Sequence, residues 1–171
     1  MSLAWRLVPL LAGRFLYLAP TESLPALRRF AAVRNANEQK PPHSLDGRWV
    51  AYASNETGRF EVYVRPVPGP GARIKVSIGG GTDPVFSKVG TSLFYRTPGH
   101  MVVARLSGSP LQVQRTDTLF ADVYDRNTLG HRGWDLMPND TAFLMVRTPP
   151  GGTQAKVVPQ WQALHRRTVP P

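Results

Sequence analysis

The sequence predicts an all-β fold, a partial β-propeller with about three four-stranded antiparallel blades. A turn followed by an apolar strand recurs at an interval of 43 residues, which relates Ser44 to Ser87 and Gly47 to Gly90. A repeat of this length, built from strands and turns, is typical of propeller blades. The apolar runs are short and rich in β-branched and aromatic residues, as buried strands are. Seventeen prolines and fifteen glycines among 171 residues favour frequent turns over long helices.

The first copy of the repeat carries the clearest turn chemistry. Asp46 can accept hydrogen bonds from backbone N–H groups just after it, and Gly47 tolerates a positive φ, so the pair predicts a tight hairpin turn. The second copy keeps Gly90 but has Val89 where the first has aspartate. A degenerate third copy, residues 137–140, follows 50 residues after the second.

The repeats define the expected domain organisation. Residues 1–34 are interpreted as an N-terminal segment, either weakly structured or a strand of a preceding blade. Residues 35–171 form the propeller-like domain, with blades at about 40–78, 79–121 and 130–165. No unbroken apolar run approaches the ~20 residues that a membrane-spanning helix needs.

Several motifs of the chain resemble a known repeat family. They are Ser44-Leu45-Asp46-Gly47-Arg48-Trp49-Val50-Ala51-Tyr52, Glu61-Val62-Tyr63-Val64-Arg65-Pro66 and Gly79-Gly80-Gly81-Thr82-Asp83-Pro84. Together they look like the TolB-like, WD40-related propeller repeat, over about residues 35–147. The similarity is closest to the propeller that follows the kinase domain in bacterial serine/threonine protein kinases. The chain departs from the family at Leu45, where proline is usual, at Val89, where aspartate is usual, and throughout the third turn.

The resemblance implies a function without catalysis. We expect a protein-interaction or sensing module, the C-terminal propeller portion of a TolB-like protein. The alternative is a propeller segment detached from an enzyme, either a serine/threonine protein kinase or a propeller-bearing peptidase, whose catalytic domain lies outside this chain. The resemblance also favours a periplasmic or extracytoplasmic location.

The composition limits the chemistry that the chain can carry. There is no cysteine, and the four histidines are scattered without the converging ligands that zinc requires. Asp122, Asp125 and Asn127 are close in sequence, but their spacing differs from that of a calcium loop and favours a solvated loop. Specific catalytic and phosphate-binding motifs are absent as well. The sequence therefore predicts a chain that is not an enzyme and has no metal or cofactor site.

The net charge of +10 permits an anionic partner, but the arginines are spread along the chain, with only two adjacent pairs. Nucleic-acid binding normally requires a localised basic patch, so it is not expected. Arginines at strand ends, such as Arg96, are interpreted as solvated.

The candidate interaction residues lie in loops, because propellers bind through loops at their rims. They are Asn55, Glu56, Arg59 and His100, all expected to be exposed. The aromatic residues are interpreted as core between blades, with a ligand-binding face as the alternative: Trp49, Tyr52, Phe86, Phe94, Tyr95, Trp134 and Phe143. Strand alternation places Val62 and Val64 on one face, and Glu61, Tyr63 and Arg65 on the other.

The number of strands predicts association. A propeller usually closes with four to eight blades, whereas the repeats account for about three. An open arc would expose apolar faces on its end blades. The chain is therefore expected to be a fragment of a longer polypeptide or to bind a protein partner. Self-association would most simply give a dimer that pools its blades into a six-bladed ring.

Overall fold

The computed structural model is all-β and antiparallel, as predicted. It describes the backbone of residues 3–10, 13–20, 28–31, 38–39, 42–67, 71–88, 92–126, 132–148 and 154–159, and the side chains of 42–67, 71–88, 92–126 and 132–148. The helix in these ranges is one 3₁₀ turn, η2 (Pro138–Asp140). No helix among the described residues has the length and apolarity needed to cross a membrane.

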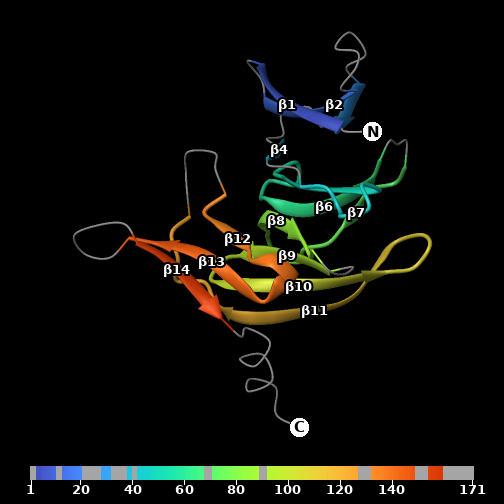
Figure 1. Cartoon of the computed structure of the whole chain (residues 1–171). Coiled ribbons are helices and arrows are strands. Elements are labelled where there is room, and N and C mark those ends of the chain that lie inside the picture. The colour runs from blue at the N-terminus through green and yellow to red at the C-terminus, as the bar shows by residue number, and fades with distance from the viewer. Residues whose placement is uncertain are drawn as a thin grey trace.

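The strands of the described residues form four sheets in chain order (Figure 1). The first contains β1 (Leu3–Leu10), β2 (Gly13–Pro20) and β3 (Arg28–Ala31). The second contains β4 (Glu38–Gln39), β5 (Trp49–Ser54), β6 (Glu61–Pro66) and β7 (Ile74–Lys75). The third contains β8 (Thr82–Phe86), β9 (Ser92–Thr97), β10 (His100–Ser107) and β11 (Gln112–Ala121). The fourth contains β12 (Trp134–Leu136), β13 (Ala142–Arg147) and β14 (Gln154–Pro159).

The described part of the chain therefore has four sheets, where the sequence predicted about three blades. The additional sheet is the N-terminal one, because β1 and β2 pair along their whole length, with Leu7 opposite Leu16 and Val8 opposite Phe15. Arg6, Pro9 and Arg14 interrupt the apolar runs of this segment, which hides its two strands from an analysis of hydrophobicity. The later sheets span residues 38–75, 82–121 and 134–159.

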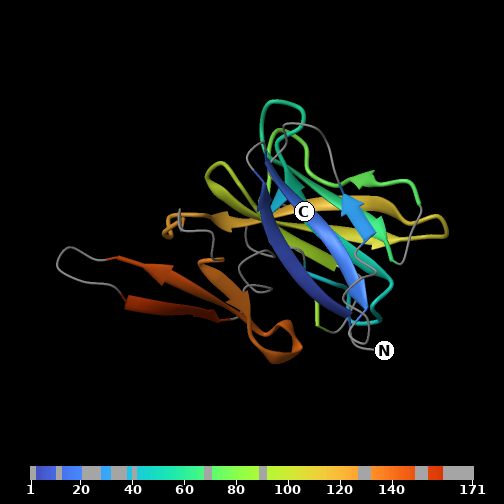
Figure 2. The same cartoon turned by 90° about the horizontal axis from the view of Figure 1, so that it is seen from above.

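Successive sheets pack face to face, and the core lies between them (Figures 1 and 2). One apolar cluster joins the second and third sheets. Its buried members are Ala51, Val62, Val64, Val76, Phe86, Leu93, Tyr95, Val102, Ala104 and Leu106. Another joins the third and fourth sheets and contains Val85, Phe94, Met101, Val103, Leu119, Trp134, Leu136, Phe143 and Met145. The predicted inter-blade role is thereby confirmed for Phe86, Phe94, Tyr95, Trp134 and Phe143, with Trp49 partly buried at the edge of the first cluster. Tyr52 is buried but belongs to neither cluster.

Strand β6 corrects the expectation of one buried and one outward face. Glu61 and Tyr63 are buried along with Val62 and Val64, because the sheet is covered on both faces. Tyr63 stacks against Tyr52 of β5, with ring centroids 5.7 Å apart. Alternation in this strand therefore separates two buried layers.

The repeat noticed in the sequence is also a repeat of backbone hydrogen bonds. Ser44 N donates to Trp49 O over 2.8 Å, Ser87 N to Ser92 O over 2.8 Å, and Met137 N to Ala142 O over 2.9 Å. These three turns each lead into the second strand of a sheet. The intervals of 43 and 50 residues therefore relate equivalent atoms.

The first turn has the conformation that its Asp-Gly pair predicts. Gly47 has φ of 69°, and its N–H donates to Ser44 O over 2.9 Å. The Asp46 carboxylate accepts from Ser44 Oγ over 2.6 Å and from Arg48 N over 3.0 Å. Gly90, the corresponding residue of the second turn, lies outside the described residues.

Replacing Gly47 by valine should lower the free energy of unfolding by more than about 1 kcal/mol, because a β-branched residue is strained at positive φ. Asparagine tolerates this backbone conformation, so Gly47→Asn should cost clearly less. Chemical denaturation of both variants measures the difference. Equal stability of Gly47→Val and the wild-type protein would contradict the proposed turn.

Candidate functional site

Four loops meet at one end of the second and third sheets, and we call this surface the crossover rim. It consists of the turns at 55–60 and 97–99 and the connections between sheets at 76–81 and 122–126. Gly81 N donates to Phe60 O over 2.8 Å, and Asp122 N donates to Gly99 O over 2.7 Å, so each connection is hydrogen-bonded to a turn. A Cβ on Gly80 would lie 3.4 Å from Pro98 Cδ, which places the two loop pairs side by side.

The crossover rim contains three of the predicted interaction residues and His100 borders it. Arg59 and His100 are exposed and Asn55 is half-buried. Glu56 was expected to be exposed, but its side chain is only 5% exposed because it forms an ion pair with Arg73. The Arg73 guanidinium in turn lies over the Tyr63 ring, 4.9 Å from the ring centroid. Glu56 thus fixes the loop, while the side chains of Arg59 and His100 are exposed at the surface.

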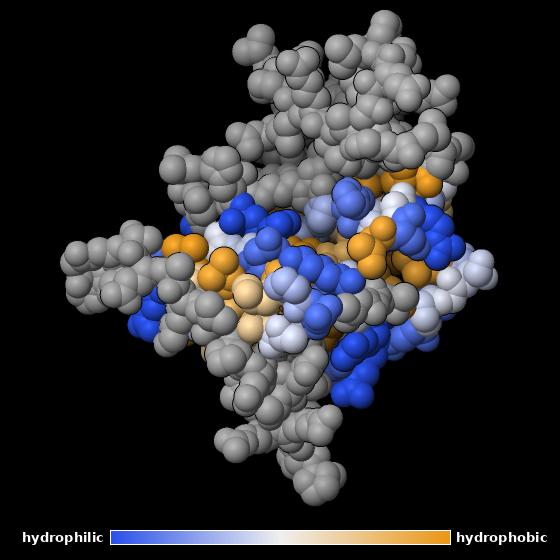
Figure 3. Space-filling view, in the orientation of Figure 1, coloured by the Kyte–Doolittle hydropathy of each residue, from blue (hydrophilic) through white to orange (hydrophobic). Residues whose placement is uncertain are grey.

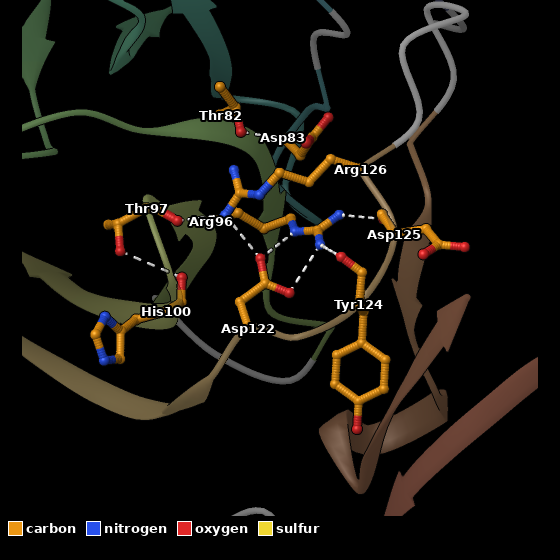
Figure 4. Close-up of polar contacts among 9 residues, drawn as sticks. All are labelled: Thr82, Asp83, Arg96, Thr97, His100, Asp122, Tyr124, Asp125 and Arg126. Atoms are coloured by element: carbon orange, nitrogen blue, oxygen red, sulfur yellow. Dashed lines mark hydrogen bonds and ion pairs between the residues drawn. The ribbon is translucent and has the colours of Figure 1, made fainter. Parts of the chain in front are cut away.

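Arg96 at the end of β9 is the centre of a polar cluster at the crossover rim (Figure 4). Its Nε donates to Asp122 Oδ2 over 2.6 Å and its Nη2 to Asp122 Oδ1 over 2.7 Å. The remaining donors reach backbone carbonyls, Nη1 to Asp125 O and Nη2 to Tyr124 O, both over 2.9 Å. Both charged side chains are 0% exposed. The planar guanidinium therefore holds residues 122–125, the first part of the connection between β11 and β12.

A second arginine completes this cluster from the solvent side. Arg126 Nη2 lies 2.7 Å from Asp122 Oδ2, and the same group donates to Thr97 O. Thr148 after β13 donates to the Asp125 carboxylate. The third and fourth sheets are thus connected through side chains as well as through the chain itself.

These contacts correct two expectations from the sequence. Arg96 is buried rather than solvated, and Asp122 belongs to an ion pair rather than to a solvated loop. Both Asp122 oxygens accept hydrogen bonds from guanidinium groups, so neither is free for a cation. Asn127 lies outside the described residues. Within the described ranges, no group of three or more acidic or histidine side chains is arranged to hold a metal ion.

Glu61 at the start of β6 fixes the other connection. It is fully buried and accepts from Ser77 Oγ, Gly80 N over 3.1 Å and Arg59 Nε over 2.8 Å, with Lys75 Nζ at 3.0 Å. Burial alone raises the pKa of a carboxyl group. Here the hydrogen bonds from Ser77, Arg59, Lys75 and Gly80 outweigh burial and lower the pKa of Glu61 to about 2. The carboxylate remains ionised and holds residues 77–80 against β6.

Sequence reasoning missed Arg96 and Glu61 as structural centres. Their position in the sequence could have identified them, because each of these charged residues lies in a strand among buried neighbours. Such a residue requires a partner, because a buried unpaired charge is strongly unfavourable. Their partners, Asp122 and Ser77, lie in connecting loops whose paths the sequence did not reveal.

The fold is similar to solved structures of TolB. The crystal structure of TolB from Acinetobacter baumannii matches with a TM-score of 0.61 and 17% identity, over 85% of this chain and 37% of that one. The structure of putative TolB from Agrobacterium tumefaciens gives a TM-score of 0.47 and 19% identity, over 85% and 50% of the two chains. Identities this low establish the fold alone. No protein-family model and no curated protein matches the sequence.

The chain spans 37% of the length of the Acinetobacter protein that it matches. The similarity to part of TolB supports the predicted propeller architecture. The more specific resemblance to kinase-associated propellers stays a prediction.

Because the folded pKa of Glu61 is about 2, below its ordinary value of 4.5, the unfolded chain takes up this proton first as the pH falls. Its contribution to stability should be complete above pH ~4.5 and disappear as the pH approaches 2. Glu61→Gln should therefore lower the free energy of unfolding by about 1–3 kcal/mol at neutral pH and by much less near pH 2.5.

Thermal unfolding of both proteins across this range tests the expectation. Asp135→Asn is the control, because Asp135 is half-exposed and its change should have little effect at either pH. A destabilisation by Glu61→Gln that is the same at pH 7 and pH 2.5 would exclude the ionised form as the stabilising species.

Proposed function

We propose that this chain is a non-catalytic interaction module, the C-terminal propeller portion of a TolB-like protein, that binds its partner through the exposed face of its fourth sheet. Each of the second and third sheets turns one face, here called the forward face, towards the next sheet in the chain. The corresponding face of the fourth sheet is called its forward face as well. The observation that carries the proposal is the difference in exposure between the residues at one repeat position on this face. They are Ala51, Phe94 and Leu144, at the same repeat position on β5, β9 and β13.

The exposed fraction of this position increases only in the last sheet. Ala51 is 0% exposed and Phe94 is 1% exposed, because each packs against the following sheet. Leu144 is 37% exposed. Val146, two residues further along β13, is half-buried, and the register pairs these residues with Val157 and Ala155 of β14. Figure 3 shows apolar surface over the region of β12 and β13.

The repeat also suggests the partner. In the two inner interfaces, the forward face is covered by the apolar face of another β-sheet of the same repeat. A second copy of this chain supplies such sheets, and two copies of four sheets would give eight, the upper end of the usual range for a propeller. This replaces the six-bladed dimer expected from three blades per chain. The exposed rim residues Arg59 and His100 would contact further partners.

The absence of catalysis is part of the proposal. What supports it is the occupation of the buried carboxylates by donors of the chain itself. Glu61 and Asp122 each accept several hydrogen bonds from these donors, so both carboxylates serve the packing of loops and neither is presented to a substrate as a general acid or base would be.

Light scattering over a range of protein concentrations tests the partner. We expect the wild-type chain to form a dimer and Leu144→Arg to shift it towards the monomer, because the substitution puts a charge into the apolar contact. Leu45→Arg is the matched control: Leu45 is 76% exposed in the first turn, away from the forward face, and its change should leave the mass unaltered.

A wild-type chain that is monomeric at every concentration would exclude the second copy as the partner. A dimer that Leu144→Arg does not weaken would show that association uses another surface. Circular dichroism of each variant confirms that the comparison is between folded proteins.

A further inference from the structure

Asp140, in the third turn, is a buried acid whose carboxylate reaches the neighbouring sheet. Oδ1 accepts from Lys88 N over 2.9 Å, and Oδ2 accepts from Ser87 Oγ. Both donors lie in the second turn, between β8 and β9. Lys88 Nζ also donates to Leu136 O of β12 over 2.6 Å. Among the described residues, the second turn is therefore joined to the third turn by two of these hydrogen bonds and to strand β12 by the other.

The first turn makes the equivalent serine–aspartate bond within itself, although its aspartate accepts from a later amide of the turn than Asp140 does. There Asp46 accepts from Ser44 Oγ and from the N–H of Arg48. Ser87 is the equivalent of Ser44 in the second repeat, but the position of Asp46 is taken by Val89. The second turn thus keeps the hydroxyl donor and has no aspartate of its own at the expected position. Its serine is bonded to an aspartate from the third turn.

The position of Asp140 is unusual for this residue. It is equivalent to Gly47 and Gly90, and its φ is 55°, in the left-handed region. The preceding Asn139 also has a positive φ of 61°. Left-handed backbone favours glycine, so the conformation alone does not explain an aspartate here. The contacts of its carboxylate across the sheet boundary do.

We propose that Asp140, which belongs to the third repeat, takes the place of the turn aspartate that the second repeat lacks. Its hydrogen bonds to Ser87 and Lys88 thereby hold the fourth sheet against the third, and we call this contact the clasp. Charge-assisted hydrogen bonds to a buried carboxylate are stronger than neutral ones. The clasp lies at the end of these sheets opposite the Arg96 cluster, so the fourth sheet is held at both ends. This inference does not depend on the proposed function, although the clasp also orients the forward face of the fourth sheet.

A thermodynamic cycle tests the replacement. Asp140→Gly removes the carboxylate and relieves the backbone strain, and we expect it to lower Tm by about 4–8 °C because the lost contacts outweigh the relief. Val89→Asp returns an aspartate to the second turn. In that background Asp140→Gly should lower Tm by less than half as much, since Ser87 then has a carboxylate within its own turn.

Hydrogen exchange identifies the bond directly. Asp140→Gly should accelerate exchange of the Lys88 amide at least about tenfold and leave the Trp49 amide, which donates to Ser44 Oγ, unchanged. If the variant is too unstable to measure, Asp140→Asn and Ser87→Ala provide milder changes with the same expected site of exchange.

Three results would overturn the proposal: an increase in Tm for Asp140→Gly, the same decrease in both backgrounds, or exchange at Lys88 that does not respond to the loss of Asp140 or of its conservative variants. The first result would mean that relief of backbone strain at position 140 outweighs the loss of the hydrogen bonds of Asp140. The other two would mean that Asp140 does not act in place of the missing aspartate.

Discussion

The position of the fourth sheet depends on the buried guanidinium of Arg96. This side chain extends from the end of β9, an inner strand of the third sheet, and binds the carboxylate and two carbonyls of the connection that leads to the fourth. The charge is removed from water, so the arrangement is stable only while all of its donors are occupied. Because β12–β14 follow this connection, the packing of Phe143 on Phe94 and the orientation of the forward face depend on it.

Apolar and polar contacts have different roles in holding the sheets together. The apolar clusters between sheets supply most of the stabilising burial, but they are not directional. Direction comes from hydrogen-bonded carboxylates at the two ends of the stack. Glu61 and Asp122 fix the connections at the crossover rim, and Asp140 fixes neighbouring turns at the opposite end. Each carboxylate accepts hydrogen bonds from a part of the chain other than its own strand or turn. These bonds set how successive sheets are placed.

The sequence was sufficient for the fold where local chemistry determines it. The Asp46-Gly47 turn, the short apolar strands and the 43-residue interval follow from turn geometry and side-chain propensity. For the N-terminal segment a strand of a preceding blade was only one of two interpretations, and a whole sheet was not predicted, because its strands are interrupted by charge and proline. Arg96, Asp122 and Asp140 were not recognised because their partners are distant in sequence: Ser87 and Asp140 are 53 residues apart. Pairings of this kind depend on how the sheets stack, which one sequence does not specify.

The free energy of unfolding of Arg96→Lys, compared with that of Arg126→Lys, tests this account most directly. Lysine keeps the charge of Arg96 but lacks the planar fork that reaches Asp122 and two carbonyls, so we expect a loss of at least about 2 kcal/mol. Arg126 binds the same carboxylate from the solvent side, and its replacement should cost no more than about 0.5 kcal/mol. Equal, small effects of the two substitutions would show that the buried guanidinium does not hold the fourth sheet in place.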